Sequence, residues 1–291
     1  MPLVTIGVCV KNSEDLVGDA IKSIAKQDFP QENMEVIIVD DGSTDRTLAV
    51  LKSKVKELNL NAKIIHQKWK GLGPTRNVVV RNSNGKYVIW VDSDMLLAKD
   101  FVKTQIAFME DNPQVGIAKG SYGIYPANIV STLENLDFVT TNSQRMRTLD
   151  PNTLGTGGSI YRIQAIRSVG GFNENIKGSG EDADAEYRIK QAGWTLERTP
   201  AIFYERRRST WHSLWAEYFW HGKGSLQVIE GKTSKTRYKF FPPFTIFIEL
   251  VRITIAYKMI RRKVALLMPL HYIFKRTAWL AGLLFARFID K

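Results

Sequence analysis

Two aspartates separated by one residue carry the clearest chemical signal in the sequence. Asp92 and Asp94 directly follow the apolar run VIWV at residues 88–91. Two carboxylates at positions i and i+2 can share a divalent cation and hold it against phosphate oxygens, because Mg²⁺ and Mn²⁺ accept both as ligands. A solvent-exposed, Asp-rich turn has the same composition. The elements around this pair must therefore distinguish a metal site from a plain turn.

The surrounding sequence alternates short apolar runs with segments of helical periodicity. Strands are predicted at residues 3–10, 34–39, 62–66 and 86–91, and helices at residues 15–27, 46–58, 127–147 and 163–169, with another beginning near Pro74. This alternation predicts an α/β fold with a Rossmann-like parallel sheet and right-handed crossovers. Ligands of such sheets bind beyond the carboxyl ends of the strands, where Asp92 and Asp94 are expected.

The usual phosphate-binding glycine motifs are missing from the sequence. No GxGxxG follows the first strand and no GxxxxGK[ST] occurs anywhere, which disfavours nicotinamide dehydrogenases and P-loop enzymes. The segment CVKN at residues 9–12 also lacks the glycine-rich, basic signature that a sugar nucleotidyltransferase would need. The remaining possibility is a site that binds a nucleotide through carboxylates and a metal ion.

The order of the polar motifs resembles the family 2 glycosyltransferases with a GT-A fold. The likeness covers about residues 3–224 and rests on Asn12, QDFP at 27–30, VDDGSTD at 39–45, Arg76-Asn77, Asp92-Ser93-Asp94, GGF at 170–172 and GED at 180–182. The resemblance implies a Rossmann-like, mixed but mainly parallel sheet with helices on both faces. It also implies an inverting enzyme that takes a sugar from a UDP- or GDP-sugar donor with the help of Mn²⁺ or Mg²⁺.

The resemblance also assigns roles at the nucleotide and metal. It implies that Cys9, Asn12, Asp41, Arg76 and Asp92 bind the nucleotide, and that Asp94 and Asp92 bind the metal. Asp41 would accept a hydrogen bond from the base, although an acid before a helix can equally be a capping residue. Arg76 would lie near the phosphates, where a guanidinium suits their oxygens, or on an ordinary helix surface.

Asp182 is the expected catalytic base. An inverting transfer needs a carboxylate that takes the proton from the acceptor hydroxyl, and Asp182 matches the family position for this role. Acids at this point can also simply stabilise a helix N-terminus. Glu181 is expected to orient the acceptor, and Gly157 to lie in a glycine-rich loop at residues 154–162 beneath the sugar.

Two residues beyond the base have open roles. Arg207 lies in a basic run at residues 206–208, which could contact the diphosphate or adjoin a membrane. Trp211 could stack on a sugar or anchor a helix at the bilayer interface. Neither the histidine that some relatives carry after the strand ending at Tyr204 nor the QxxRW of processive synthases occurs, which disfavours a polymerase.

Positive charge is concentrated at the C-terminus. The 291-residue chain has a formal net charge of +12, and residues 231–291 hold thirteen Lys/Arg against two acids. The apolar stretches 241–260 and 264–288 are both interrupted by charges, so neither reaches the roughly 18 to 20 apolar residues of a spanning helix. Helices lying in the membrane interface fit better. Helices packed on the catalytic domain are the alternative; no nucleic-acid-binding module accompanies the charge.

These observations predict a GT-A catalytic domain at residues 1–230 and a membrane-associated helical tail at residues 231–291. The expected acceptor is a lipid-linked glycan or polyprenyl phosphate at the cytoplasmic face of the membrane, since no signal sequence opens the chain. A single cysteine excludes an intrachain disulfide. The alternatives are a soluble glycosyltransferase for surface polysaccharide and a catalytically silent, membrane-bound scaffold that binds sugar nucleotides.

Overall fold

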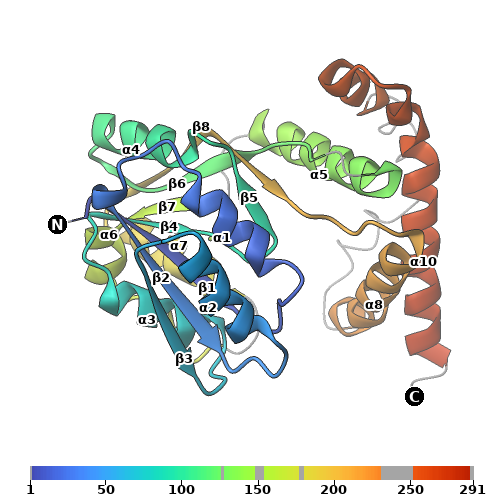
Figure 1. Cartoon of the computed structure of the whole chain (residues 1–291). Coiled ribbons are helices and arrows are strands. Elements are labelled where there is room, and N and C mark those ends of the chain that lie inside the picture. The colour runs from blue at the N-terminus through green and yellow to red at the C-terminus, as the bar shows by residue number, and fades with distance from the viewer. Residues whose placement is uncertain (1, 126–127, 148–153, 177–179, 231–251, 289–291) are drawn as a thin grey trace. The chain divides into compact units, whose positions relative to one another are not determined.

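Two units make up the chain in the computed structural model, which describes residues 2–125, 128–147, 154–176, 180–230 and 252–288 (Figure 1). The first unit comprises Met1–Gly123 with Asp150–Glu205, and the second comprises Ile124–Leu149 with Arg206–Lys291. The structure thus divides the chain differently from the predicted boundary after residue 230. Residues 124–149 and 206–230 belong to the same unit as the C-terminal helices, because both pack against these helices and the first also pairs with charged residues on them.

A single eight-stranded sheet runs through the first unit in the order β3-β2-β1-β4-β7-β6-β8-β5. Strands β3, β2, β1 and β4 are mutually parallel, whereas β7 is antiparallel to both of its neighbours and β5 is antiparallel to β8. The strands are β1 (Val4–Val10), β2 (Met34–Asp41), β3 (Ala62–Gln67), β4 (Tyr87–Trp90), β5 (Met95–Leu97), β6 (Val115–Tyr122), β7 (Ser159–Arg162) and β8 (Thr195–Glu205). The predicted mixed, mainly parallel α/β sheet is confirmed.

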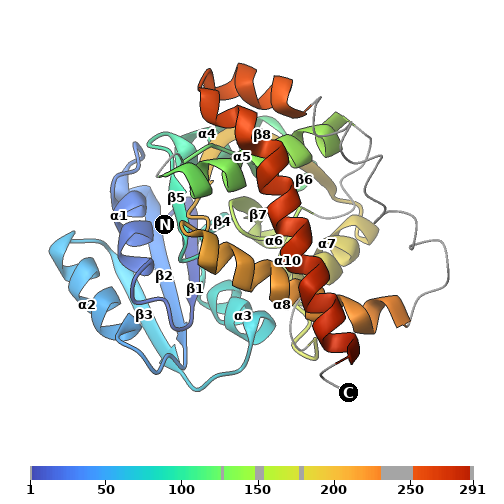
Figure 2. The same cartoon turned by 90° about the vertical axis from the view of Figure 1, so that its right-hand side faces the viewer.

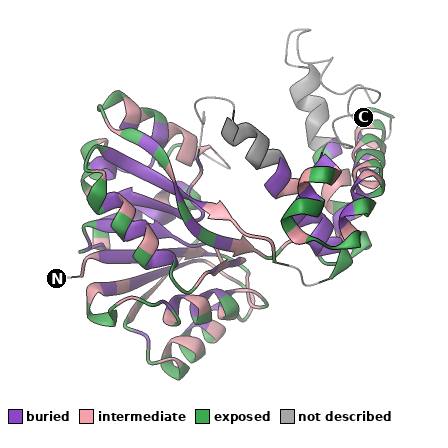
Figure 3. Ribbon diagram, turned by 90° about the horizontal axis from the view of Figure 1, so that it is seen from above, coloured by how far each residue is buried: buried purple, intermediate pink, exposed green. Residues whose placement is uncertain are grey.

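Helices cover both faces of this sheet because its strands are apolar on both sides. Alternate residues of β2 enter two separate cores: Val36 and Ile38 pack with one, Ile37 and Val39 with the other. The first core includes residues of α1 (Val17–Ala25), α2 (Thr47–Glu57) and α4 (Phe101–Asp111), and the second those of α3 (Leu72–Asn82), α6 (Ile163–Ser168) and α7 (Glu181–Gln191). Figure 3 shows the buried residues concentrated along the strands.

The second unit is helical among its described residues. It contains α5 (Ile129–Arg147), α8 (Trp211–Glu230), a helical segment at residues 252–260, η3 (Lys263–Leu267) and α10 (Met268–Phe288). The apolar stretch predicted at 264–288 therefore forms η3 and α10, while the first part of the stretch at 241–260 lies outside the described residues. None of the helices described in full is long and apolar enough to cross a membrane.

Helices α8 and α10 approach each other closely at two glycines (Figure 2). A side chain built on Gly282 would collide with the carbonyl oxygen of Phe219, and one on Gly222 with the carbonyl oxygen of Trp279. Only residues without a side chain allow two helix backbones to come this near. The crossing therefore depends on this pair of glycines.

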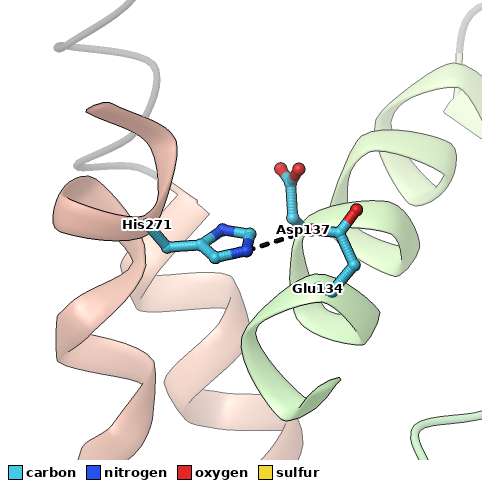
Figure 4. Close-up of side chains that lie close together, drawn as sticks. All are labelled: Glu134, Asp137 and His271. Atoms are coloured by element: carbon cyan, nitrogen blue, oxygen red, sulfur yellow. Dashed lines mark ion pairs between the residues drawn. The ribbon is translucent and has the colours of Figure 1, made fainter. Parts of the chain in front are cut away.

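A cluster of five charged or titratable side chains joins α5 to the C-terminal helices; we call it the buried ion cluster, and Figure 4 shows three of its members, Glu134, Asp137 and His271. Its members are Glu134, Asp137, Arg252, His271 and Lys275. Lys275 Nζ lies 2.9 Å from Glu134 Oε2 and also contacts Asp137, which accepts a further hydrogen bond from Arg252. His271 Nε2 is 3.0 Å from Glu134 Oε2. These contacts tie residues near 135 to residues beyond 250 and explain their grouping into one unit.

Neighbouring basic side chains lower the pKa values of the two acids in the buried ion cluster. Burial alone would raise the pKa of Asp137, but neighbouring Lys275 and Arg252 outweigh it and hold that pKa at about 2. The pKa of Glu134 is likewise lowered by His271 and Lys275 against the effect of burial. Both carboxylates are therefore charged at neutral pH and stabilise the folded state there.

Gly282→Ala should destabilise the protein, because the added methyl group forces α8 and α10 apart. We expect a loss of about 1–3 kcal/mol in the free energy of unfolding, measured by urea denaturation and circular dichroism. Gly18→Ala in α1 is the control, since its methyl group would meet Lys54 only at an ordinary distance of 3.6 Å and should be neutral or slightly stabilising. Equal effects of the two substitutions would contradict the close crossing.

Asp137→Asn should lower stability in a pH-dependent way. Because the folded-state pKa of Asp137 lies below its unfolded value, the carboxylate stabilises the protein above about pH 4 and loses that effect as pH falls towards 2. The variant should be less stable by about 2 kcal/mol at pH 7, and the difference should shrink towards pH 2. Urea denaturation at pH 7, 4 and 2.5 measures it, with the exposed Glu57→Gln as control. A difference that is constant with pH would show that Asp137 acts through packing instead of charge.

Candidate active site

The Asp92-Ser93-Asp94 triplet forms a tight turn between β4 and β5. The Asp92 amide donates to Met95 Sδ at 3.3 Å, the Met95 amide donates to the Asp92 carbonyl at 3.0 Å, and Ser93 Oγ donates to Ser13 Oγ, also at 3.0 Å. Asp92 and Asp94 are both partly exposed. The predicted metal ligands therefore lie at the carboxyl end of β4, beside the residues that follow β1.

A glycine-rich loop at residues 154–158 lies against this turn. A side chain on Gly157 would come within 2.5 Å of Asp92 Oδ2, and one on Gly155 within 3.6 Å of Asp182 Oδ2. The predicted metal ligand and the predicted base thus lie against the same short loop. A side chain at Gly157 would displace Asp92, whereas Gly155 lies at an ordinary contact distance from Asp182 and suits glycine through its φ of 76°.

Two buried side chains of opposite charge hold the glycine-rich loop. Glu186 accepts hydrogen bonds from the Leu154 amide at 2.7 Å and the Gly155 amide at 2.6 Å, and Lys119 donates to the Gly157 carbonyl. Burial raises the pKa of Glu186, and burial lowers the pKa of Lys119 to about 8, although Glu205 and Asp92 nearby favour its charged form. Neither residue belonged to the predicted site.

Glu181 and Asp182 begin α7, immediately after Gly180, whose φ of 114° starts the helix from a left-handed conformation. Asp182 is partly exposed and its Oδ1 accepts from the Ala183 amide at 2.8 Å. A carboxylate in this position is of the chemical type that can take a proton from a hydroxyl group. Asp184, one turn before Arg188 on the same helix, instead pairs with that residue at 2.6 Å.

Arg76 and Glu181 form a buried ion pair that sequence reasoning did not anticipate. The Arg76 guanidinium contacts Glu181 Oε1 and lies 5.7 Å from the centre of the Phe172 ring. Burial opposes the charge of Arg76, but neighbouring acids, among them Asp92, outweigh it and raise the pKa of Arg76. Glu181 Oε2 is buried and accepts no hydrogen bond from the residues that the structure describes.

Asp41 holds the loop after β3 in this structure. Its carboxylate accepts from Gln67 Nε2 at 2.8 Å and from the Lys70 and Gly71 amides at 2.9 Å each. A carboxylate offers about four acceptor positions, so one remains for a nucleotide base. The base contact of Asp41 stays a prediction, and its alternative role as a helix cap is replaced by this loop contact.

Asn12 and Cys9 lie at the carboxyl end of β1. Asn12 adopts a φ of 49°, and its side chain accepts from the Thr44 amide at 2.8 Å, which ties β1 to the loop after β2. Burial raises the pKa of the Cys9 thiol to about 12, so it stays protonated. Both residues are placed at the edge where the nucleotide is expected, and their contacts with it stay predictions.

The donor set at Asp92 and Asp94 fits a hard divalent cation whose remaining ligands are phosphate oxygens and water. Within the described ranges, one group of three His or acidic ligands lies close enough together to bind a metal, and it is Glu134, Asp137 and His271. Lys275 already supplies positive charge at that group, so we favour the aspartate turn as the metal site.

Arg207 and Trp211 both belong to the second unit. The Arg207 guanidinium lies 3.9 Å over the Phe138 ring, and the Trp211 ring packs edge-on against Phe274 with centroids 4.9 Å apart. Their predicted contacts with the diphosphate or the acceptor stay predictions.

The sequence contained signals for the two residues that were missed. Glu186 lies four residues after Asp182 on α7, so the helical repeat places both on one side. Lys119 interrupts the buried strand VGIAKGSY, and a lysine in such a strand needs a buried partner. Neither signal names the partner, which comes from a distant part of the chain.

Comparisons with known proteins agree with this geometry. The sequence profile described as Glycosyl transferase family 2 matches residues 5–170. The poly(ribitol-phosphate) beta-N-acetylglucosaminyltransferase TarS of Staphylococcus aureus is 38% identical over 175 residues, which cover 59% of this chain but only 29% of that relative.

Two solved structures share the fold. The mannosyltransferase PcManGT from Pyrobaculum calidifontis, in complex with GDP-Man and Mn²⁺, superposes with a TM-score of 0.60 over 100% of this chain and 88% of that one, at 15% identity. Residues 1–349 of S. aureus TarS in complex with UDP-GlcNAc give a TM-score of 0.54 at 20% identity, over 99% of this chain and 92% of that fragment. The profile match spans more than half of the sequence, and the chain is a transferase that belongs to glycosyl transferase family 2.

Proposed function

We propose that the protein is an inverting, metal-dependent glycosyltransferase that moves a sugar from a UDP- or GDP-sugar to a glycan or lipid-linked acceptor at a membrane surface. The observation that carries this proposal is the glycine-rich loop, which brings Asp92 and Asp182 to one site. Such a site can hold a sugar between a metal-bound diphosphate and a base. The similar structures that contain UDP-GlcNAc and GDP-Man support a nucleoside-diphosphate sugar as the donor.

Asp182 would take the proton of the acceptor hydroxyl as its oxygen attacks the anomeric carbon. The bond from that carbon to the diphosphate breaks at the same time, so the configuration at the anomeric carbon is inverted. Asp92 and Asp94 would hold the metal, which when bound neutralises the departing diphosphate. Glu181 Oε2, buried and without a donor among the described residues, would orient the acceptor.

The exposed surface of α10 supports an acceptor at a membrane. Five of its eight exposed residues are apolar, namely Leu270, Ile273, Leu280, Leu284 and Phe288, and the other three are Arg276, Thr277 and Arg287. Its buried residues include His271 and Lys275 beside Met268, Ala278, Gly282 and Ala286. A helix of a water-soluble domain usually turns its large apolar side chains to the core and not to the outside. A helix of this kind can bury its outer face in a lipid bilayer.

Charge favours an anionic membrane as the partner of this surface. Exposed basic residues lie at both ends of the apolar stripe and beside it: Lys258, Arg261, Arg262, Lys263, Arg276 and Arg287. Each basic residue near an anionic bilayer contributes about 1 kcal/mol. We therefore infer that α10 and the preceding segment lie in the membrane interface. We propose the cytoplasmic face because nucleotide sugars are made in the cytoplasm.

Nucleotide release is the direct test of the transferase. Wild-type protein in detergent, given crude lipid extract, should release UDP or GDP from one of UDP-GlcNAc, UDP-glucose or GDP-mannose only with Mn²⁺ or Mg²⁺. Asp182→Asn and Asp94→Ala should each lower the rate about a hundredfold or more, because they remove the base and a metal ligand.

Asp184→Asn is the matched control for this experiment. It removes a neighbouring acid of the same helix that pairs with Arg188, and its rate should stay near that of wild type. Retained release in Asp182→Asn would remove Asp182 from the mechanism. Protein that binds a sugar nucleotide but never turns over would favour the silent scaffold.

Vesicle flotation tests the membrane surface. Wild type should float with vesicles containing one quarter phosphatidylglycerol and bind pure phosphatidylcholine vesicles less. A double variant, Leu270→Glu and Leu284→Glu, should lose most of this binding, because charged side chains cannot enter the bilayer. Tyr187→Glu is the control, since Tyr187 and Leu270 are both 64% exposed. Wild type that stays in the soluble fraction would favour the soluble enzyme for surface polysaccharide.

A further inference from the structure

A tryptophan stands exposed at the sheet edge where the nucleotide is proposed to bind. Trp69 is 67% exposed and follows β3 in the loop that Asp41 holds. Large aromatic side chains are usually buried, because exposing them to water forgoes a large hydrophobic gain. The fold nevertheless keeps this indole outside both cores of the first unit.

The backbone at Trp69 is held firmly in place. The Lys70 and Gly71 amides donate to Asp41, and the Trp69 amide nitrogen lies 2.7 Å from the position that a side chain of Gly42 would occupy. Gly42 has a φ of 74°, which suits glycine and allows the loop to pack directly on the end of β2. The indole is therefore presented from a fixed backbone beside the acid predicted to contact the base.

One side of the indole carries a cation. Lys11, which directly follows β1, places its Nζ 4.6 Å from the centre of the Trp69 ring. A cation over one face of an indole leaves the opposite face for another planar group. Because β1, β2 and β3 are adjacent and parallel, Lys11, Asp41 and Trp69 come from the same edge of the sheet.

We propose that Trp69 is the stacking platform for the nucleobase of the donor, with Lys11 on its other face. This inference rests on the proposed function, since it assigns a residue to the nucleotide site of that enzyme. Stacking on an aromatic ring tolerates every base, so Trp69 adds affinity for the nucleotide and leaves the choice of base to hydrogen bonds such as that of Asp41. The sugar and the acceptor do not contact it.

Nucleotide binding by the full-length protein in detergent tests the proposal. With Mg²⁺ present, calorimetry should show UDP or GDP binding to wild type, with quenching of tryptophan fluorescence. Trp69→Ala should weaken that binding about five- to a hundredfold and lose most of the quenching, whereas Trp69→Phe should keep most of the affinity. Inorganic pyrophosphate, which has no base, should bind wild type and Trp69→Ala equally.

Trp220→Ala is the matched control, because Trp220 is 70% exposed and belongs to the second unit. Its nucleotide affinity should equal that of wild type. Wild type that binds neither nucleotide would overturn the proposed function itself. If wild type and Trp69→Ala bind the nucleotide equally well, only the role of Trp69 is overturned. The same holds if Trp69→Ala keeps its nucleotide affinity but loses vesicle binding.

Discussion

The candidate active site depends on how the glycine-rich loop is held between two buried charges. Glu186 accepts hydrogen bonds from the Leu154 and Gly155 amides and Lys119 donates to the Gly157 carbonyl, while the Gly158 amide donates to the Trp90 carbonyl at the end of β4. The loop is thus fixed to the strand that delivers Asp92 and to the helix that delivers Asp182. Because a protein interior is densely packed, a shift of this loop would move both acids together.

The parallel half of the fold could be predicted from sequence because its signals are local. Short apolar runs identified β1, β2 and β4, and acids marked the carboxyl ends of β2 and β4. The predicted helices differ from the observed ones by only a few residues at their ends. Family resemblance then placed Asp92 and Asp182. The structure adds that both face one loop, which no local pattern expresses.

Features that depend on distant partners could not be predicted. The pair Arg76–Glu181 joins residues on α3 and α7, and each alone resembles an ordinary helix residue. The second unit gives a clearer case. Lys275 interrupts an apolar stretch of the sequence, yet its side chain is buried because it pairs with Glu134 and Asp137 on α5. Whether such a charge faces water or the interior is decided by contacts far apart in the chain.

The order of strands has a consequence for synthesis on the ribosome. Strand β4 pairs with β1 on one side and on the other with β7, which begins only at Ser159, after all of α5 has been made. Until then the nascent chain exposes the hydrogen-bonding edge of β4 and the apolar ring of Trp90, which later packs against Tyr161 and Phe172. An open edge of this kind can pair with other chains. The stage most prone to aggregation is therefore the half-made chain, and protection by chaperones matters most before β7 emerges.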